Sequence, residues 1–347
     1  MVILDWKKKK NKFVEKTLLV DGDNLFKIGF HGVRDFYHNG NHIGGIYHFI
    51  NTLRRHLEEH NFDKVLVCWD GENNSSERRK IYPNYKLNRR YEDNDFKKQS
   101  YDFQKNRVRL YLEEMFVRQI QLSNCESDDA IAYYCLISKN EIKTIFSADK
   151  DYLQLVSDTI SVYSPLSKTL YQVGSKVKLS EYEIPVSNVY TYKIMTGDKS
   201  DNIAGIYRLG EKKMVKFFPE ILENAISVDD ILTKTNELIK EDKNNLTLQN
   251  ILSGKTKEGI FGDEYYEILR KIVDLKNPIL SDESKEIIQQ YYEESLDPDG
   301  RGYKNLIRMM TEDGMFKYLP KQDDAWVSFL KPFMKLTRKE KRKFNKN

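Results

Sequence analysis

The sequence predicts an α/β protein: a mostly parallel central sheet flanked by helices and followed by a helical extension. Three short apolar runs, at 17–20, 65–69 and 144–147, have the length and composition of buried parallel strands. Segments long enough for helices separate them, as the alternation of strands and helices in such a fold requires. Beyond residue 190 the pattern becomes helical, which indicates a second part of different architecture.

The first half alternates predicted strands with predicted helices. Gly29, Gly32 and the stretch 40–45 predict a loop after the first strand, and 45–60 predicts a helix with one apolar face. Residues 70–106 have no sustained apolar period, so they are the least core-like part of this half. The other elements predicted here are helices at 107–119, 125–139 and 152–156 and strands at 160–164 and 170–173.

The second half is predicted to be mainly helical. Short helices at 190–195 and 211–218 flank a Gly-Asp turn, the stretch 240–257 is polar with little predicted order, and amphipathic helices follow at 264–275 and 284–293. An apolar stripe near the end consists of Trp326, Phe329, Leu330, Phe333 and Met334. This stripe favours core packing against the helical half over docking of a partner protein.

Composition excludes several classes of protein. A chain of 347 residues with 39% hydrophobic and 32% charged residues suits about two globular domains. It has no apolar stretch near the ~20 residues that a membrane span needs, and its first residues lack the order of a signal peptide. Three scattered cysteines favour a reducing cytoplasm over a disulfide framework.

Positive charge is concentrated, although the net charge is only +4. Between residues 78 and 109 there are eleven Lys or Arg and four acidic residues. Such separation suits a polyanionic partner. Basic residues also gather in an N-terminal arm, 1–16, and a C-terminal tail, 336–347, for which solvated, disordered ends are the simpler interpretation.

Carboxylates follow each of the three predicted strands. Asp21 and Asp70 come directly after the first two, and Asp149 and Asp151 follow the third. Further acidic clusters are Glu126-Ser127-Asp128-Asp129 and Gly197-Asp198-Lys199-Ser200-Asp201. Ligands bind beyond the carboxyl ends of parallel strands, and gathered carboxylates repel one another unless Mg²⁺, Mn²⁺ or Ca²⁺ lies between them. Any one of them alone could be a turn former or a helix cap, but together they predict a metal site that acts on phosphate.

The ordered set of motifs resembles a known family. Val20–Asn24, Trp69–Gly71, Glu126–Ala130, Ser147–Asp151 and Gly197–Ile203 are similar in order to the 5′-nuclease (flap endonuclease) family. Within it the pattern is most similar to bacteriophage 5′–3′ exonucleases, including those of the ribonuclease H type. The resemblance covers about the first two thirds of the chain. It implies a PIN-like nuclease core that removes RNA primers and 5′ flaps in replication or repair.

The resemblance also implies the ligands of two Mg²⁺ ions, for which Mn²⁺ can substitute. The first ion would be held by Asp21, Asp70, Glu126 and Asp128. The second would be held by Asp149, Asp151 and Asp201, with Asp198 close by and Asp129 acting directly, through water or as a cap. Two such ions activate a water and neutralise the leaving oxygen. Lys86 and Arg89 match the catalytic basic residues that stabilise the scissile phosphate.

Two segments are expected to bind nucleic acid. The first is a basic arch at 75–106, in which phosphates are neutralised and bases stack; its expected contacts are Arg78, Arg79, Lys80, Tyr82, Tyr85 and Arg90. The second is a helix–hairpin–helix segment at 190–220, with Gly205, Arg208, Gly210, Lys212 and Lys213. This sequence departs from the family there, because Arg208 stands where a glycine is usual and Tyr207 where a proline is common.

The domains predicted are the arm, a nuclease core at 17–189, a helical domain at 190–335 and the tail. The expected partners are nicked or branched DNA with a 5′ flap and RNA–DNA hybrid, bound by a cytoplasmic monomer without membrane contact. A sliding clamp or single-strand-binding protein is a further candidate partner for the apolar stripe. Alternatives are a haloacid-dehalogenase-like phosphatase with Asp21 as nucleophile and a catalytically degenerate DNA-binding relative.

Overall fold

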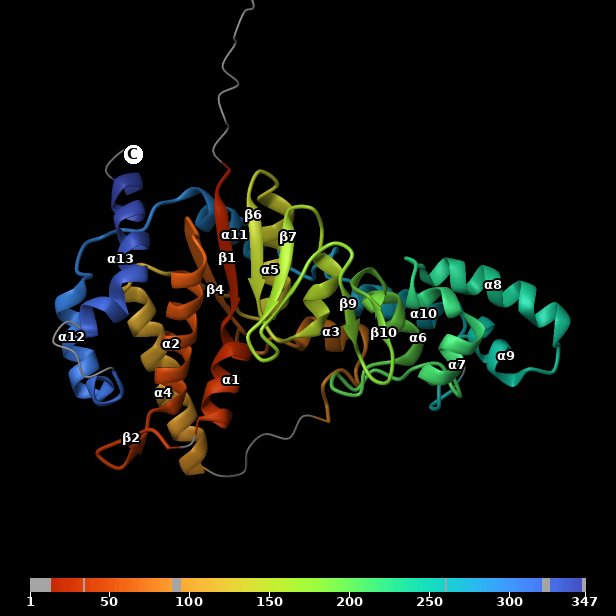
Figure 1. The fold of residues 1–347 in the computed structure, drawn as a ribbon. Coiled ribbons are helices and arrows are strands. Elements are labelled where there is room, and N and C mark those ends of the chain that lie inside the picture. The colour runs from red at the N-terminus through yellow and green to blue at the C-terminus, as the bar shows by residue number, and fades with distance from the viewer. Residues whose placement is uncertain (1–13, 34, 89–94, 260, 320–324, 345–347) are drawn as a thin grey trace, which may run out of the picture.

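The computed structural model describes residues 14–33, 35–88, 95–259, 261–319 and 325–344 (Figure 1). Most of the N-terminal arm, Arg89, Arg90 and the last three residues of the tail therefore lie outside the described residues. Within them a six-stranded sheet has the order β5-β4-β1-β6-β7-β8. All neighbours pair in parallel except β7 and β8, which are antiparallel. The predicted α/β fold with a mostly parallel sheet is confirmed.

The three strands that end in carboxylates lie side by side. β1 (Lys16–Asp21) is central, between β4 (Lys64–Trp69) and β6 (Ile142–Phe146). Asp21 is in register with Cys68, and Val20 with both Val67 and Phe146. The residues that follow these strands therefore emerge at one edge of the sheet, which we call the carboxyl edge.

The outer strands are shorter. β7 spans Ile160–Ser164 and β8 spans Thr169–Tyr171, as predicted. β5 (Arg118–Gln121) was not predicted, and the helix expected at 107–119 is wrong: α4 spans Asp95–Glu114 instead. Only Arg118 and Ile120 of β5 are buried, so their alternation reads equally well as the end of an amphipathic helix.

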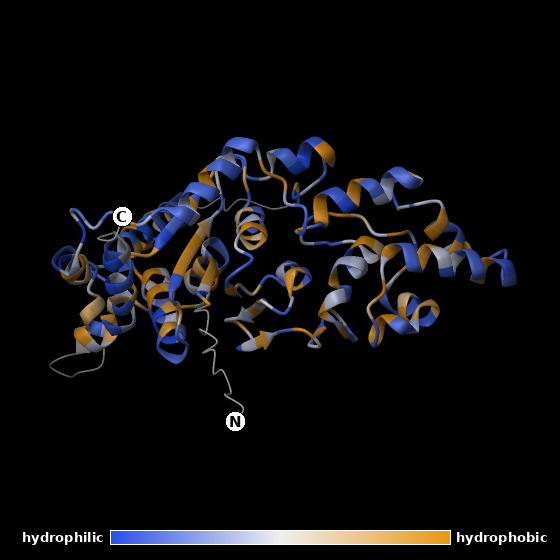
Figure 2. Ribbon diagram, turned by 90° about the horizontal axis from the view of Figure 1, so that it is seen from above, coloured by the Kyte–Doolittle hydropathy of each residue, from blue (hydrophilic) through white to orange (hydrophobic). Residues whose placement is uncertain are grey.

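Helices cover both faces of the sheet. On one face lie α1 (Gly22–Gly32), α2 (Gly44–Glu59) and α4, and on the other lie α5 (Ser127–Ile137) and α11 (Asp282–Glu293) (Figure 1). Successive side chains of β1 alternate between the two faces. Leu18 and Val20 pack into the apolar cluster with α1, α2 and α4, and Leu19 packs into the cluster with α5 and α11. Figure 2 shows a central strand in hydrophobic orange between helices with hydrophilic outer faces.

The loop predicted around Gly29 and Gly32 is wrong, because both belong to α1. A Cβ built on Gly29 would lie 2.7 Å from the His48 ring of α2. The glycine therefore permits close packing of two helices rather than a turn. The real turn follows it, as the hairpin of β2 (Tyr37–His38) and β3 (Asn41–His42).

The helical extension forms the lobe to the right in Figure 1. It contains α6 (Val189–Thr196), α7 (Glu211–Phe217), α8 (Val228–Glu241), α9 (Leu246–Leu252) and α10 (Asp263–Val273), and α3 (Ser76–Ile81) packs on α10. The little order expected at 240–257 is wrong, since α9 lies there with the Asn245 side chain capping its first amides. Two short strands, β9 (Lys176–Lys178) and β10 (Glu183–Pro185), lead into this lobe.

The C-terminal helices return to the α/β part of the chain. α12 (Tyr303–Glu312) packs on α4, and α13 (Ala325–Phe344) packs on α2. Core packing of the apolar stripe is confirmed, since Phe329, Leu330 and Phe333 are buried, but they join the core beside α2 and not the helical half. The basic tail is helical to Phe344, and its Glu340 forms a buried ion pair with Arg118 at 3.0 Å, so the disorder expected for this part is wrong.

None of the helices that the structure describes is long and apolar enough to span a bilayer.

Candidate metal centre

A cavity of about 370 Å³ lies at the carboxyl edge of the sheet. Six carboxylates line it: Asp21, Asp23, Asp70, Glu126, Asp128 and Asp149. Two lysines, Lys27 from α1 and Lys86 from the segment after α3, line it as well. The structure thus brings together five of the predicted metal ligands from four separate stretches of the chain.

One backbone amide and three hydroxyl groups hold the Asp21 side chain in place by donating hydrogen bonds to it. It caps α1 by accepting from the amide of Asn24 at 3.1 Å. The hydroxyls of Ser147 and Tyr152 donate to its Oδ2 at 3.1 and 3.2 Å, and Ser127 donates to Oδ1 at 3.4 Å. Burial, followed by repulsion from Asp70, raises the pKa of Asp21 to about 7.

Asp70 and Glu126 differ from Asp21 because cations lie next to them. Burial alone would raise the pKa of Asp70, but Lys27, the Ser127 amide and Lys86 hold it below its usual range. Burial likewise opposes ionisation of Glu126, yet Arg78 and Lys86 keep its pKa low. Both side chains are therefore carboxylates at neutral pH and can serve as anionic ligands.

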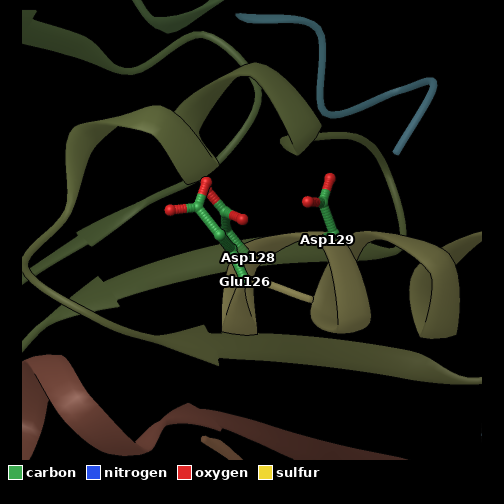
Figure 3. Close-up of side chains that lie close together, drawn as sticks. All are labelled: Glu126, Asp128 and Asp129. Carbon is green, nitrogen blue, oxygen red and sulfur yellow. The ribbon is translucent and has the colours of Figure 1, made fainter. Parts of the chain in front are cut away.

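Asp128 is the least satisfied of the carboxylates. Its Oδ1 is buried without a hydrogen-bond partner within the described residues, and its nearest cation is Arg78 Nη2 at 3.7 Å. Burial raises its pKa well above the usual range, with Glu126 and Asp129 adding to the effect. Figure 3 shows Asp128 and Glu126 pointing the same way from the start of α5. An orphaned oxygen among like charges fits a divalent cation, because such an ion supplies the missing partner.

Asp129 has a different partner, although an oxygen of Asp129, Asp128 and Glu126 each lies within 4.8 Å of the others. The Arg78 guanidinium lies among these three carboxylates and grips both oxygens of Asp129, with Nη2 to Oδ1 at 3.0 Å. Asp129 also accepts the Ile279 amide at 2.9 Å and stands apart from the other two side chains in Figure 3. The cation beside Asp129 in this structure is thus an arginine, and its role as a metal ligand stays a prediction.

Arg78 and Tyr85, expected to contact nucleic acid, are buried. Arg78 is 4% exposed and also donates to the Ile272 carbonyl at 3.0 Å. Tyr85 is 2% exposed, and its hydroxyl donates to Glu126 at 2.9 Å and to Asp201 at 3.4 Å. These two residues lie inside the protein and hold the carboxylates of the metal centre in place. The expectation that they contact the substrate is wrong.

Lys86 lines the cavity of the metal centre, and its catalytic role stays a prediction. Its ammonium donates to Glu126 and lies over the Tyr85 ring, 4.7 Å from the centroid. Its backbone has a φ of +56°, a left-handed conformation that costs a lysine about 1 kcal/mol. Strain of this kind gathers at functional sites because the surroundings impose it.

A second acidic cluster lies beside the first. Oxygens of Asp151, Asp198 and Asp201 lie within 4.8 Å of one another, and the Tyr85 hydroxyl links Asp201 to Glu126. Asp149 was assigned to this group with the second ion, but it lines the first cavity, and it accepts the Asp151 amide at 2.9 Å. It therefore stands at the junction of the two clusters.

Sequence reasoning missed three residues at these clusters. The Lys193 ammonium, from α6, donates to Asp151 and lies 2.6 Å from Asp198. Lys27 of α1 lines the first cavity, but its spacing of six residues from Asp21 is not one that places two residues on the same helix face, so the sequence pattern did not reveal it. Asp23 was left out, yet it lines the same cavity, accepts the Asp70 amide at 2.8 Å and pairs with Lys105 of α4 at 2.6 Å.

The remaining arch residues extend the positive surface. Arg79, Lys80, Lys27 and Lys86 line a larger cavity of about 900 Å³ that shares Asp70 with the metal centre. Lys80 is exposed, and Arg79 donates to the Tyr85 carbonyl at 3.0 Å. Tyr82 is half-buried. Arg89 and Arg90 lie outside the described residues, so their roles stay predictions.

The hairpin between α6 and α7 presents backbone and lysines at the surface. Gly205 lies against the Thr196 carbonyl, where a Cβ would come within 2.2 Å, so only glycine fits. Arg208 adopts a φ of +67°, the left-handed conformation that a glycine would adopt without strain. Gly210 and Lys212 are exposed, and Lys213 donates to Thr247 of α9 at 2.9 Å. Arg208 therefore adopts, at a cost in backbone strain, the conformation that a glycine would adopt freely at this position.

Fold and site together define a class: α/β proteins with a divalent-metal site of carboxylates at the carboxyl edge of the sheet. Residues 16–183 match the family described as 5′–3′ exonuclease, N-terminal resolvase-like domain. The chain is 32% identical over 210 residues to a 5′–3′ exonuclease of Halalkalibacterium halodurans, covering 56% of this chain and 66% of that protein. It is 28% identical over 208 residues to the thermostable DNA polymerase I of Thermus aquaticus, covering 59% of this chain and 24% of that protein.

Solved structures share the fold. The T5 5′-exonuclease with bound zinc ions superposes with a TM-score of 0.59 at 17% identity, covering 87% of this chain and 99% of that chain. The T5 D15 flap endonuclease in a pseudo-enzyme–product complex with DNA and metal ions gives 0.60 at 19% identity, covering 81% and 100%. Residues 16–183, just under half of the chain, are thus similar in sequence to the 5′–3′ exonuclease family, and the fold is that of the T5 enzyme.

Proposed function

We propose that the protein is a Mg²⁺-dependent 5′ nuclease that acts as a 5′–3′ exonuclease and flap endonuclease. The observation that carries the proposal is the buried oxygen of Asp128, which has no hydrogen-bond partner in the described part of the chain, within a cavity lined by five further carboxylates. Oxygen ligands of this kind favour Mg²⁺, and Mn²⁺ can replace it. The two lysines in the same wall give the cavity a counterpart for phosphate.

The residues divide into ligands and positioning groups. Asp21, Asp70, Glu126, Asp128 and Asp149 would hold one ion, and Asp151, Asp198 and Asp201 a second. When bound, such ions activate a water and stabilise the leaving oxygen of the phosphodiester. Lys86 and Lys27 would donate to the non-bridging oxygens of a phosphate in the cavity, an electrostatic contribution. Tyr85 would keep Glu126 and Asp201 in place by donating to both.

The substrate we propose is a nicked or branched duplex with an unpaired 5′ strand. The arch lysines and the α6–α7 hairpin support it, since they present positive charge and closely approachable backbone, which suit contacts with phosphates. The flap-endonuclease neighbour that holds DNA agrees with this substrate class. Cleavage of RNA–DNA hybrids, as in primer removal, and action as a monomer in the cytoplasm are further parts of the proposal.

The phosphatase alternative does not suit Asp21. A nucleophilic carboxylate needs a free oxygen facing the phosphorus atom, whereas both oxygens of Asp21 accept hydrogen bonds. Its pKa, raised to about 7 by burial, weakens it further as a nucleophile.

The test uses a 5′-flap duplex labelled at each end in turn, with Mg²⁺ or EDTA. Wild type is compared with Asp149→Asn and with Asp282→Asn, a control whose side chain is 93% exposed at the start of α11. We expect metal-dependent cleavage near the junction or stepwise from the 5′ end, lost in Asp149→Asn and kept in Asp282→Asn. Tight binding without cleavage by wild type would instead indicate a degenerate DNA-binding relative.

A further inference from the structure

A second cavity lies away from the metal centre, between the far ends of α1 and α4 and the β2–β3 hairpin. Its volume is about 430 Å³. Its lining includes Phe30, His31, Tyr37, His42, Phe96 and Lys97. Five of these six residues carry aromatic rings, and Lys97 carries an ammonium group. Aromatic faces beside positive charge are the requirement for holding single-stranded nucleic acid.

The rings are arranged as an inner wall and an exposed rim. Phe30 is buried, and its ring lies 5.6 Å from that of His42, which lies 5.4 Å from that of Tyr37. Phe96 is 74% exposed and Tyr37 48% exposed. Exposed aromatic rings that gather at the rim of a cavity, together with buried rings inside it, indicate a binding surface.

The cavity is connected to the metal centre by two helices. Asp21 caps the start of α1, and at 1.5 Å per residue His31 lies about 15 Å further along the helix. α4 is joined to the centre by the Lys105–Asp23 pair, and Lys97 lies about 12 Å from Lys105 along that helix. Figure 1 shows α1 and α4 descending together from the carboxyl edge toward β2. A strand with one phosphate in the metal centre therefore reaches the cavity with a nucleotide a few positions away.

We propose that this cavity binds an unpaired nucleobase of the 5′ single strand, stacked between Phe96 and Tyr37, with Lys97 contacting its phosphate. The inference rests on the proposed nuclease function and specifies how that site holds its substrate. It also replaces the stacking expected of other arch aromatics. Tyr85 is buried under the metal centre, and Tyr101 packs edge-on against Phe26.

The first measurement is the affinity of the full chain for a 5′-flap duplex in EDTA, by fluorescence anisotropy. A single abasic nucleotide is moved along the unpaired strand, one position at a time. We expect wild type to lose about tenfold in affinity at one position a few nucleotides from the junction, because one stacked base is lost. The Phe96→Ala/Tyr37→Ala variant should bind the intact flap as weakly as wild type binds that abasic flap, and should show no such position.

The matched control is Leu110→Ala, which removes an apolar side chain, 47% exposed, from the same helix outside the cavity. It should reproduce the wild-type profile. A flat abasic profile in wild type, or equal loss of affinity by the double variant for a nicked duplex without a flap, would overturn the proposal. Because binding in EDTA requires no hydrolysis, a wild type that shows the profile but cleaves nothing would remove the nuclease function and leave the base site standing.

Discussion

The two edges of the central sheet bury charge in opposite ways. At the edge where the strands begin, which we call the amino edge, Lys64 lies 3.0 Å from Glu141. The hydroxyls of Thr17 and Tyr134 donate to the same carboxylate at 2.7 and 3.1 Å. At the carboxyl edge, six carboxylates share a cavity with two lysines, and Asp128 keeps an oxygen without a partner among the described residues. A single strand, β1, runs from Thr17 at one edge to Asp21 at the other.

The comparison teaches how buried charge can be classified. A buried carboxylate with a cation and two hydroxyl donors is satisfied by the protein itself, so its role is structural. A group of carboxylates with too few cations destabilises the fold, and it persists because something outside the chain compensates for it. Shortage of partners, more than burial or charge alone, therefore distinguishes the functional edge from the structural edge.

The largest effect expected concerns Asp128 and activity. Asp128→Asn removes a charged ligand, so we expect flap cleavage in Mg²⁺ to fall about a thousandfold, the equivalent of ~4 kcal/mol of transition-state stabilisation. The unfolding free energy in EDTA should rise, because burial, and after it the charges of Glu126 and Asp129, disfavours a carboxylate at this position, whereas the asparagine is always neutral. Cleavage rates and urea titrations of the same samples check both signs. A variant that is less stable than wild type and fully active would show that the carboxylates of the carboxyl edge are structural and not functional.

The next effect is a pH dependence of stability caused by Asp21. Its pKa is about 7 in the folded metal-free protein and near the ordinary 3.8 when unfolded. The folded state thus binds more protons between these values, and stability falls as pH rises from about 4 to 7. The size is on the order of 4 kcal/mol. Urea titrations in EDTA across this range should show the slope. Asp21→Asn should make it shallower by this amount, with the raised pKa of Asp128 accounting for a remaining slope, and saturating Mg²⁺ should flatten it.

At the amino edge the sign of a carboxylate substitution should invert. Glu141→Gln removes the nearer of the two carboxylates beside the buried Lys64 and leaves only Glu15, at 3.4 Å, so we expect a loss of about 2 kcal/mol in unfolding free energy. Flap cleavage by the folded fraction should stay at the wild-type rate. Denaturant unfolding and cleavage at low temperature, where the variant stays folded, separate the two. A stability equal to wild type would mean that this carboxylate, too, lacks adequate partners.

Much of the carboxyl edge could be predicted from the chain. Asp21 and Asp70 follow apolar runs, and parallel pairing in register places both at one edge, as the structure confirms. β5 could not be recognised from the sequence, because a strand of four residues is too short for its alternation of buried and less buried side chains to form a clear pattern. The loop predicted at Gly29 was wrong because a glycine required for helix packing is indistinguishable in sequence from one required for a turn.

The partner of each charge was beyond sequence reasoning. Arg78 looked like a phosphate contact because it stands in a basic segment, but Asp129, 51 residues later, neutralises it. Lys193 was overlooked because its targets, Asp151 and Asp198, come together only when α6 packs on the 3-10 helix Lys150–Leu155. The sequence shows which residues are charged, whereas the partner that each charged group acquires depends on tertiary contacts.

The smallest effect expected is also the strictest test of the comparison, because it concerns a buried charge whose removal should matter little. Lys143 is 1% exposed at the amino edge, and its ammonium donates to the Ser138 carbonyl at 2.5 Å. That carbonyl also accepts the Glu141 amide at 3.1 Å, so Lys143→Met leaves it satisfied. Because burial already lowers the pKa of Lys143, the lysine gains little from its charge there. We expect the unfolding free energy to change by less than about 1 kcal/mol in urea titrations. A loss comparable to that of Glu141→Gln would show that the amino edge depends on its total charge and not on the partners of each group.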